Sequence, residues 1–134
     1  MTNKRQYDEY SQRKELQSAN WRVEKADKIE FNHGSETNKH IQTKVAAAIV
    51  LQERGYRIDS EVEMEGGTVD LLGYGRDDGD VIVVECETSP TEDVISDKIE
   101  RYIYNQPPRE CYVLDTNETP TDFIESIEWM RNQL

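Results

Sequence analysis

The chain has 134 residues, of which 35% are hydrophobic and 33% are charged, and its formal net charge is −12. This length suits one domain with its own hydrophobic core, and no apolar run is long enough to span a bilayer. We therefore expect a soluble, cytoplasmic protein with no membrane partner. Cys86 and Cys111 fall in predicted buried strands, so we expect small core residues, not parts of a disulfide or a zinc site.

The negative charge bears on the class of partner. Nucleic-acid binding favours a basic surface, so a net charge of −12 argues against it. However, acidic surfaces are typical of halophilic proteins, and the Debye length falls to about 3 Å at 1 M salt. The charge alone therefore leaves a nucleic-acid partner open.

Residues 1–34 form a polar N-terminal extension, and residues 35–134 form the predicted domain. Part of the extension is predicted to be a helix over Gln6–Ser18 that packs on the domain or on a second subunit. A mobile arm is the alternative, because the segment is very polar and lacks a clear helical repeat.

A helix is predicted over residues 35–54, with Ser35 as its N-cap and Gly55 just beyond its end. Its second half is almost entirely apolar, so we expect it to be buried. Its first half carries polar residues four positions apart, which share one stripe of the helix. This stripe is either an exposed face with ion pairs or one wall of a functional site. Its residues are Glu36, His40 and Lys44.

The first predicted hairpin begins with an alternating strand over residues 56–65. Gly66-Gly67 is its predicted loop, which places Glu63 opposite Asp70. Glu61 or Glu63 then extends an acidic cluster around Asp70. The alternative is a solvated edge strand whose charges discourage aggregation.

Residues 68–87 predict a second hairpin, with its turn at Asp78-Gly79. Two registers remain open: Asp70 lies opposite Glu87 in one and opposite Glu85 in the other. In both registers the three carboxylates share one face, because side chains alternate along a strand. Like charges this close repel, so we expect a wet face, shared protons or a divalent cation between them.

The remaining elements are a helix, a strand and a helix. Ser89 or Thr91 caps the first helix, whose predicted apolar face includes Val94, Ile95, Ile99, Tyr102 and Ile103. Glu110–Asp115 is a strand that should lie parallel to the preceding one after a right-handed crossover. A last helix begins at Thr119 or Thr121. The residues predicted to face the sheet from it are Phe123, Ile124, Ile127 and Met130.

The predicted order is thus an αβββαβ core with a mixed sheet, preceded by a polar extension and followed by a C-terminal helix. Asp70, followed after fourteen residues by Glu85-Cys86-Glu87, resembles the signature of the PD-(D/E)XK nucleases. The resemblance implies a restriction-endonuclease-like α/β fold and metal-dependent hydrolysis of phosphodiester bonds in DNA or RNA. It further implies Mg²⁺ or Mn²⁺ held by Asp70, Glu85 and the carbonyl of Cys86.

The chain departs from the signature at Glu87, which stands where the family has a lysine. In an active enzyme, Glu87 would bind a second metal ion or act as a base, and a lysine would come from elsewhere. Lys44 is the first candidate, since the pattern of Glu36, His40 and Lys44 resembles competence-protein-like nuclease domains. Lys98 is the second candidate.

The resemblance also suggests roles for further residues and leaves alternatives open. His40 could move a proton or contact a phosphate, and Lys98 and Arg101 could bind phosphates of the nucleic acid. A homodimer is expected if so small a domain is to span a duplex. The alternative function is a catalytically inactive protein of the same fold that binds nucleic acid or a protein partner. A third reading is a small acidic interaction protein whose carboxylates are only surface.

Overall fold

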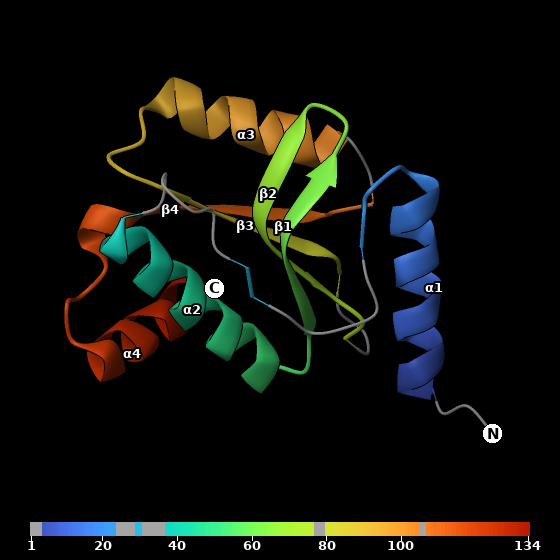
Figure 1. Cartoon of the computed structure of the whole chain (residues 1–134), viewed down its shortest axis with the longest axis horizontal. Helices are drawn as coiled ribbons and strands as arrows, with labels where there is room; N and C mark the ends of the chain where they lie inside the picture. The colour runs from blue at the N-terminus through green and yellow to red at the C-terminus, as the bar shows by residue number, and fades with distance from the viewer. Residues whose placement is uncertain (1–3, 24–28, 31–36, 77–79, 105–106) are drawn as a thin grey trace.

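The structure is a computed structural model that describes all residues except 1–3, 24–28, 31–36, 77–79 and 105–106 (Figure 1). The helices are α1 (Lys4–Ser18), α2 (Asn38–Glu53), α3 (Glu92–Tyr104) and α4 (Phe123–Gln133), with one 3₁₀ turn, η1 (Thr116–Glu118). The strands are β1 (Arg57–Met64), β2 (Gly67–Tyr74), β3 (Ile82–Glu87) and β4 (Glu110–Asp115).

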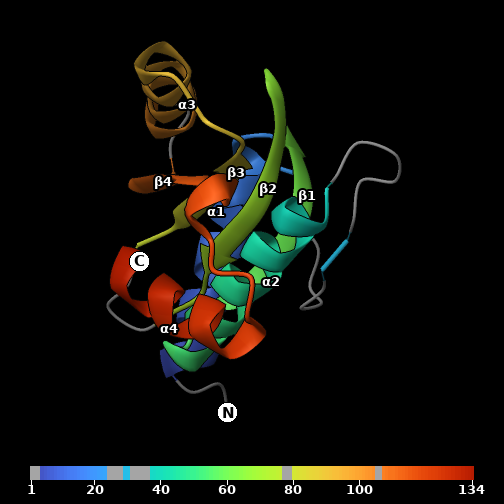
Figure 2. The same cartoon turned by 90° about the vertical axis from the view of Figure 1, so that its left-hand side faces the viewer.

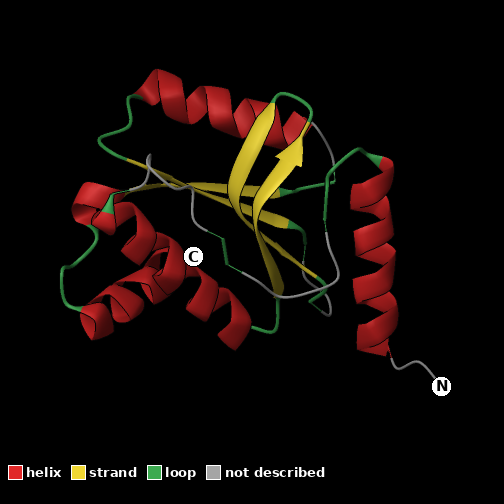
Figure 3. Ribbon diagram, viewed as in Figure 1, coloured by secondary structure: helices red, strands yellow, loops and turns green. Residues whose placement is uncertain are grey.

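The four strands form one sheet in the order β1-β2-β3-β4 (Figure 3). β1, β2 and β3 are antiparallel neighbours, whereas β4 pairs parallel to β3 after the crossover through α3. The α/β core with a mixed sheet, predicted from the sequence, is therefore confirmed. β3 is central, and its run of β-branched residues is buried on both faces, as the sequence predicts.

Helices cover both faces of the sheet (Figures 1 and 2). α2 and α4 pack on one face, in a cluster that includes Leu51, Leu71, Val84 and Met130. α1 and α3 flank the other face, where a second cluster includes Leu16, Val69, Val83 and Tyr102. None of the helices built from the described residues combines the length and apolar character that crossing a bilayer requires.

The N-terminal helix expected over Gln6–Ser18 is present and begins at Lys4. Leu16 is fully buried in the second cluster, and Trp21 just after the helix packs against Tyr102 of α3, with ring centroids 6.3 Å apart. This segment therefore packs on the domain, which was the first of the two alternatives for it.

α2 is held against the sheet by small buried residues, Ala46–Ala48, which let the helix approach closely. The helix begins at Asn38 because Thr37 caps it: the Thr37 hydroxyl accepts a hydrogen bond of 3.1 Å from the backbone N–H of His40. The predicted cap, Ser35, lies outside the described residues. Gly55 follows the helix with φ +91°, as predicted for its end.

The first hairpin turns one residue earlier than predicted. Met64 pairs with Gly67, so the loop consists of Glu65 and Gly66, not of Gly66-Gly67. Gly66 takes φ +98°, a conformation that glycine adopts without strain. The prediction placed both glycines in the loop, whereas Gly67 is the first residue of β2.

The shifted turn changes which acidic residue lies beside Asp70. Glu63 pairs with Thr68, so its predicted place opposite Asp70 is wrong. The pairs on either side leave Glu61 level with Asp70 instead. Glu61 has φ +50°, a left-handed conformation that interrupts the regular ladder at this point.

The second hairpin adopts one of the two predicted registers. Leu71 pairs with Val84 and Gly73 with Ile82, so the register carried one step further sets Asp70 against Glu85. Residues 77–79 of its turn, which include Asp78-Gly79, lie outside those described.

The sequence assigned the inward faces of the last two helices incompletely. Thr91 caps α3, with its hydroxyl 3.2 Å from the N–H of Val94, but Val94 and Ile99 are exposed while Tyr102 is buried. α4 begins at Phe123, and its fully buried residues are Ser126 and Met130, one turn apart. Of the residues predicted to face the sheet, Met130 lies in the first core cluster and Ile127 packs against it.

As a consequence, Phe123 and Ile124 are 46% and 65% exposed and do not face the sheet. The N-cap of α4 is Asp122, whose carboxylate accepts a 3.0 Å hydrogen bond from the N–H of Glu125. The predicted cap Thr119 is buried and bonds to the Thr43 hydroxyl instead.

Candidate functional site

Two carboxylates meet where the pairing of β2 and β3 ends. The backbone N–H of Asp70 donates to Oε2 of Glu85 at 2.8 Å, and the N–H of Cys86 donates to Oδ2 of Asp70 at 2.8 Å. Each carboxylate thus binds the backbone of the opposite strand, beyond the last ladder pair. These reciprocal bonds fix both side chains on the two central strands of the sheet.

Glu85 is the more buried of the two acids, with 2% of its surface exposed. Its Oε1 accepts hydrogen bonds from Tyr102 at 2.7 Å and from Lys98 at 3.1 Å, both on α3. Burial, followed by the charge of Asp70, raises the pKa of Glu85 to about 7, although Lys98 and Tyr102 oppose the shift. Glu85 therefore gains and loses its proton near neutral pH.

Asp70 shows the opposite behaviour. Burial by itself would raise the pKa of Asp70, but hydrogen bonds from His40, Glu85 and the Cys86 N–H together hold the pKa below its ordinary value. The Nε2 atom of His40 lies 3.4 Å from Oδ1 of Asp70. The pair thus keeps its charge on Asp70 and its exchangeable proton on Glu85, a division typical of acid–base sites.

Lys98 forms ion pairs with both acidic residues of β3. Its ammonium lies 3.1 Å from the carboxylate of Glu85 and 2.7 Å from that of Glu87. Burial would lower the pKa of Lys98, but the bonds to Glu87 and Glu85 outweigh it and raise the pKa. The ammonium remains charged at the wall of the site.

Lys44, the first candidate for the migrated lysine, has a different position. Its side chain is fully buried, and its ammonium donates to Oε1 of Glu61 at 2.7 Å and to the backbone carbonyl of Glu30. Glu61 is thus drawn into an ion pair at the irregular point of β1. The ammonium that the structure places on Glu85 is that of Lys98.

Within the polar stripe predicted on α2, His40 lies next to Asp70 and Cys86 of the sheet. His40, Asp70 and Cys86 each offer one atom able to bind a metal ion, and these atoms lie within 4.8 Å of one another. Cys86 was predicted as a core residue whose carbonyl binds metal, so the position of its thiol is new. Glu36, the first member of the stripe, lies outside the described residues.

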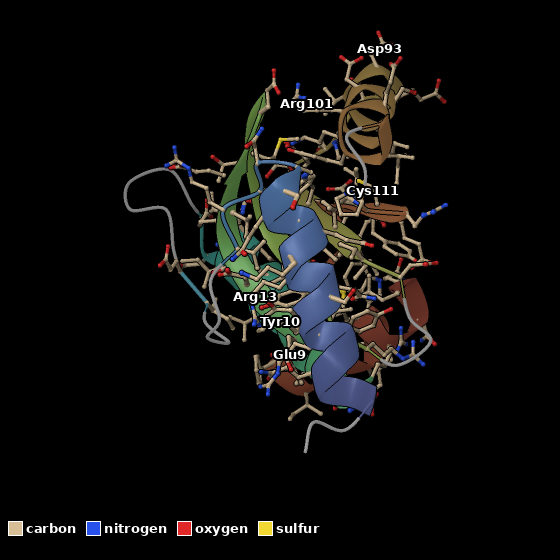
Figure 4. All side chains as sticks on the ribbon, turned by 90° about the vertical axis from the view of Figure 1, so that its right-hand side faces the viewer. Glu9, Tyr10, Arg13, Asp93, Arg101 and Cys111 are labelled. Carbon is tan, nitrogen blue, oxygen red and sulfur yellow. The ribbon has the colours of Figure 1, made fainter. Side chains whose placement is uncertain are left out.

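Arg101 lies beside Tyr102 and the turn between β1 and β2. Its guanidinium is 5.9 Å from the centroid of the Tyr102 ring, and Figure 4 shows it on α3, toward the β1–β2 hairpin. The sequence placed Tyr102 only on the apolar face of this helix and did not predict its hydrogen bond to Glu85 in the candidate site. The available signal was its spacing, since Lys98 and Tyr102 are one helical turn apart and so share a stripe.

Neither protein families, nor curated proteins, nor solved structures gave a match to this chain.

The donor atoms fit a hard divalent cation. Mg²⁺ and Mn²⁺ prefer oxygen ligands, which the carboxylates of Asp70 and Glu85 supply from adjacent strands. A carboxylate oxygen has two acceptor sites, so Oε2 of Glu85 keeps one beyond its bond to the Asp70 N–H. The backbone carbonyl of Cys86, the residue after Glu85, is the third oxygen donor that the family resemblance implies.

Proposed function

We propose that this chain is a metal-dependent phosphodiester hydrolase of the nuclease type, which acts on DNA or RNA in the cytoplasm. The observation that carries the proposal is the meeting of Asp70 and Glu85 on two central strands, with the Lys98 ammonium on Glu85. The strand order adds support, because the αβββαβ core carries the acidic pair on its second and third strands. This is the arrangement that the PD-(D/E)XK resemblance implies.

Asp70, Glu85 and the carbonyl of Cys86 would hold Mg²⁺ or Mn²⁺. When bound, the ion would polarise a phosphodiester and lower the pKa of a water molecule. Asp70 is suited to this task because its lowered pKa keeps it ionised, and its Oδ2 is fixed by the Cys86 N–H. Glu85 gives up its proton readily near neutral pH.

Lys98 takes the electrostatic role that the signature lysine has in the family. Its ammonium reaches the site from α3 and lies beside Glu87, the residue at the signature lysine position. There it stabilises negative charge that develops on a phosphate in the transition state. Glu87 is the more exposed acid of the pair on β3, and it can accept a proton from an attacking water.

The second candidate function is binding without catalysis, to nucleic acid or to a protein. The observation that favours it is that Oε1 of Glu85 accepts hydrogen bonds from both Tyr102 and Lys98. These bonds stabilise the fold whether or not the protein is catalytically active. A second copy of the chain would help either function, since a homodimer could span a duplex.

A cleavage assay separates the two functions. Supercoiled plasmid and labelled single strands of DNA and RNA are incubated with Mg²⁺ or Mn²⁺, in low and in multimolar KCl. Asp70→Asn removes one ligand charge, and Glu118→Gln, an exposed carboxylate on η1, is the matched control. We expect metal-dependent cutting by wild type and Glu118→Gln, and none by Asp70→Asn.

Folded wild-type protein that binds nucleic acid but never cuts would assign it to the second function. Cutting by Asp70→Asn at the wild-type rate would overturn the proposed site.

A further inference from the structure

We propose that His40, Asp70 and Cys86 form a Zn²⁺ site on the α2 side of the sheet, with a fourth position open to water or an anionic ligand. This site uses the thiol of Cys86 and the imidazole of His40, neither of which the proposed hydrolase needs as a metal ligand. It does not depend on phosphodiester hydrolysis.

The separations suit a tetrahedral ion. Bonds from Zn²⁺ to nitrogen, oxygen and sulfur are about 2.0–2.3 Å, so neighbouring ligand atoms lie roughly 3.3–3.8 Å apart. Nε2 of His40 and Oδ1 of Asp70 are already 3.4 Å apart. All three ligand atoms lie within 4.8 Å of one another, so small side-chain rotations bring the thiol of Cys86 into range.

The three residues stand on rigid elements. His40 is in the first turn of α2, which the Thr37 cap holds through the His40 N–H. Asp70 and Cys86 lie on adjacent central strands, and the Cys86 N–H binds Oδ2 of Asp70. That bond leaves Oδ1 directed to His40. The bond from the Cys86 N–H to Oδ2 is an outer hydrogen bond of the kind that orients a ligating carboxylate.

The donor types select the metal. Mg²⁺ and Ca²⁺ take oxygen ligands, whereas one imidazole, one carboxylate and one thiolate match the mixed set that Zn²⁺ accepts. The thiol would release its proton to solvent as the metal–sulfur bond forms. Three protein ligands leave one tetrahedral position for an exogenous ligand, as in catalytic zinc sites.

Glu85 and Cys86 distinguish this site from the hydrolase site, although both proposals use Asp70. Glu85 lies next to Cys86 on β3, and alternation turns the two side chains to opposite faces of the sheet. Glu85 contacts Tyr102 and Lys98 of α3, while Cys86 lies with His40 of α2. Asp70 touches both groups, so variants of Glu85 and Cys86, not of Asp70, distinguish the two proposals.

The test is titration of the full chain with Co²⁺, a spectroscopic substitute for Zn²⁺. Wild type should develop a thiolate-to-cobalt charge-transfer band that saturates at one equivalent and is displaced by Zn²⁺. Cys86→Ser should lose the band. Cys111→Ser is the matched control and should keep it, because Cys111 lies on β4 (Figure 4) and packs against the cluster on the α1 and α3 face of the sheet. Loss of an outer hydrogen bond costs 10–100-fold in metal affinity, so His40→Ala should weaken Zn²⁺ binding at least about 100-fold.

Glu85→Gln should keep the cobalt band while it abolishes any phosphodiester cleavage, so the two proposals can fail separately. X-ray absorption at the zinc edge of wild-type protein tests the site without a variant and should show one sulfur at about 2.3 Å. A band that survives in Cys86→Ser or disappears in Cys111→Ser would overturn the site. A zinc shell without sulfur, or no binding by wild type, would do the same.

Discussion

The ammonium of Lys98, on α3, lies 2.7 Å from the carboxylate of Glu87, the residue at the signature lysine position of β3. A positive charge is therefore present at this position although the strand itself carries an acid. The Lys98 side chain extends from α3 to Glu87 on the sheet. For the hydrolase proposed above, we therefore expect catalysis to depend on Lys98, and not on Lys44.

Replacing Lys98 should slow cleavage strongly without abolishing metal binding. Lys98→Met keeps the aliphatic stem and removes the charge, and loss of such a preorganised electrostatic group costs about 10²–10³ in kcat. Single-turnover cleavage rates and the Mn²⁺-induced rise in Tm would be measured together. Lys98→Arg, which keeps the charge, is the control and should retain part of the rate. Full activity in Lys98→Met would exclude this role for the ammonium.

Replacing Lys44 should act on stability instead. Its buried ammonium pairs with Glu61, and breaking a buried pair by removing one partner costs about 3–5 kcal/mol. Lys44→Met should therefore lower the urea midpoint strongly, and Lys44→Met combined with Glu61→Gln should recover part of the loss. The urea midpoints of both variants provide the measurement. A stable Lys44→Met protein that has lost only cleavage would return the catalytic role to Lys44.

Glu85 should make the protein less stable as pH rises toward neutrality. Its pKa is raised from the ordinary value of 4.5 to about 7, so between these values the folded state binds more protons than the unfolded state. Stability from this group is complete below pH 4.5 and is lost as pH rises through about 7. Urea midpoints taken across this window should fall for wild type, and Glu85→Gln should remove that component of the slope. Identical slopes in both proteins would show that Glu85 titrates normally.

Tyr102 should lower the pKa of Glu85. Its hydroxyl donates to Oε1 of Glu85 and lowers the pKa of that carboxyl, so Tyr102→Phe should shift the titration to higher pH. Loss of a hydrogen bond to a buried carboxyl should also cost about 1–3 kcal/mol. NMR titration of the Glu85 side-chain carbon would detect the shift. Tyr112→Phe, on β4 in the other core cluster, should leave the titration where it is.

The sequence predicted the order of the elements and one face of the site, for identifiable reasons. The β-branched run before Glu85 and the period of two were strong local signals, and both open registers kept Asp70 near the acids of β3. The role of Lys98 depended on how α3 crosses the sheet, which no local pattern encodes. The thiol of Cys86 was assigned to the core because burial alone suggested it, and the approach of His40 is a tertiary contact.

The turn of the first hairpin is a further feature that the local sequence pattern did not predict correctly. Gly66 and Gly67 are equal as turn formers in the sequence, but only Gly66 takes a positive φ, of +98°. Gly66→Ala should therefore be destabilised by about 1–2 kcal/mol, since a Cβ is strained in that conformation. Gly67→Ala is the matched control, because its Cβ would meet the Arg101 guanidinium at 3.5 Å, an ordinary contact. Thermal unfolding of the two variants should show a lower Tm for Gly66→Ala. The reverse order would restore the predicted Gly66-Gly67 loop and, with it, Glu63 as the neighbour of Asp70.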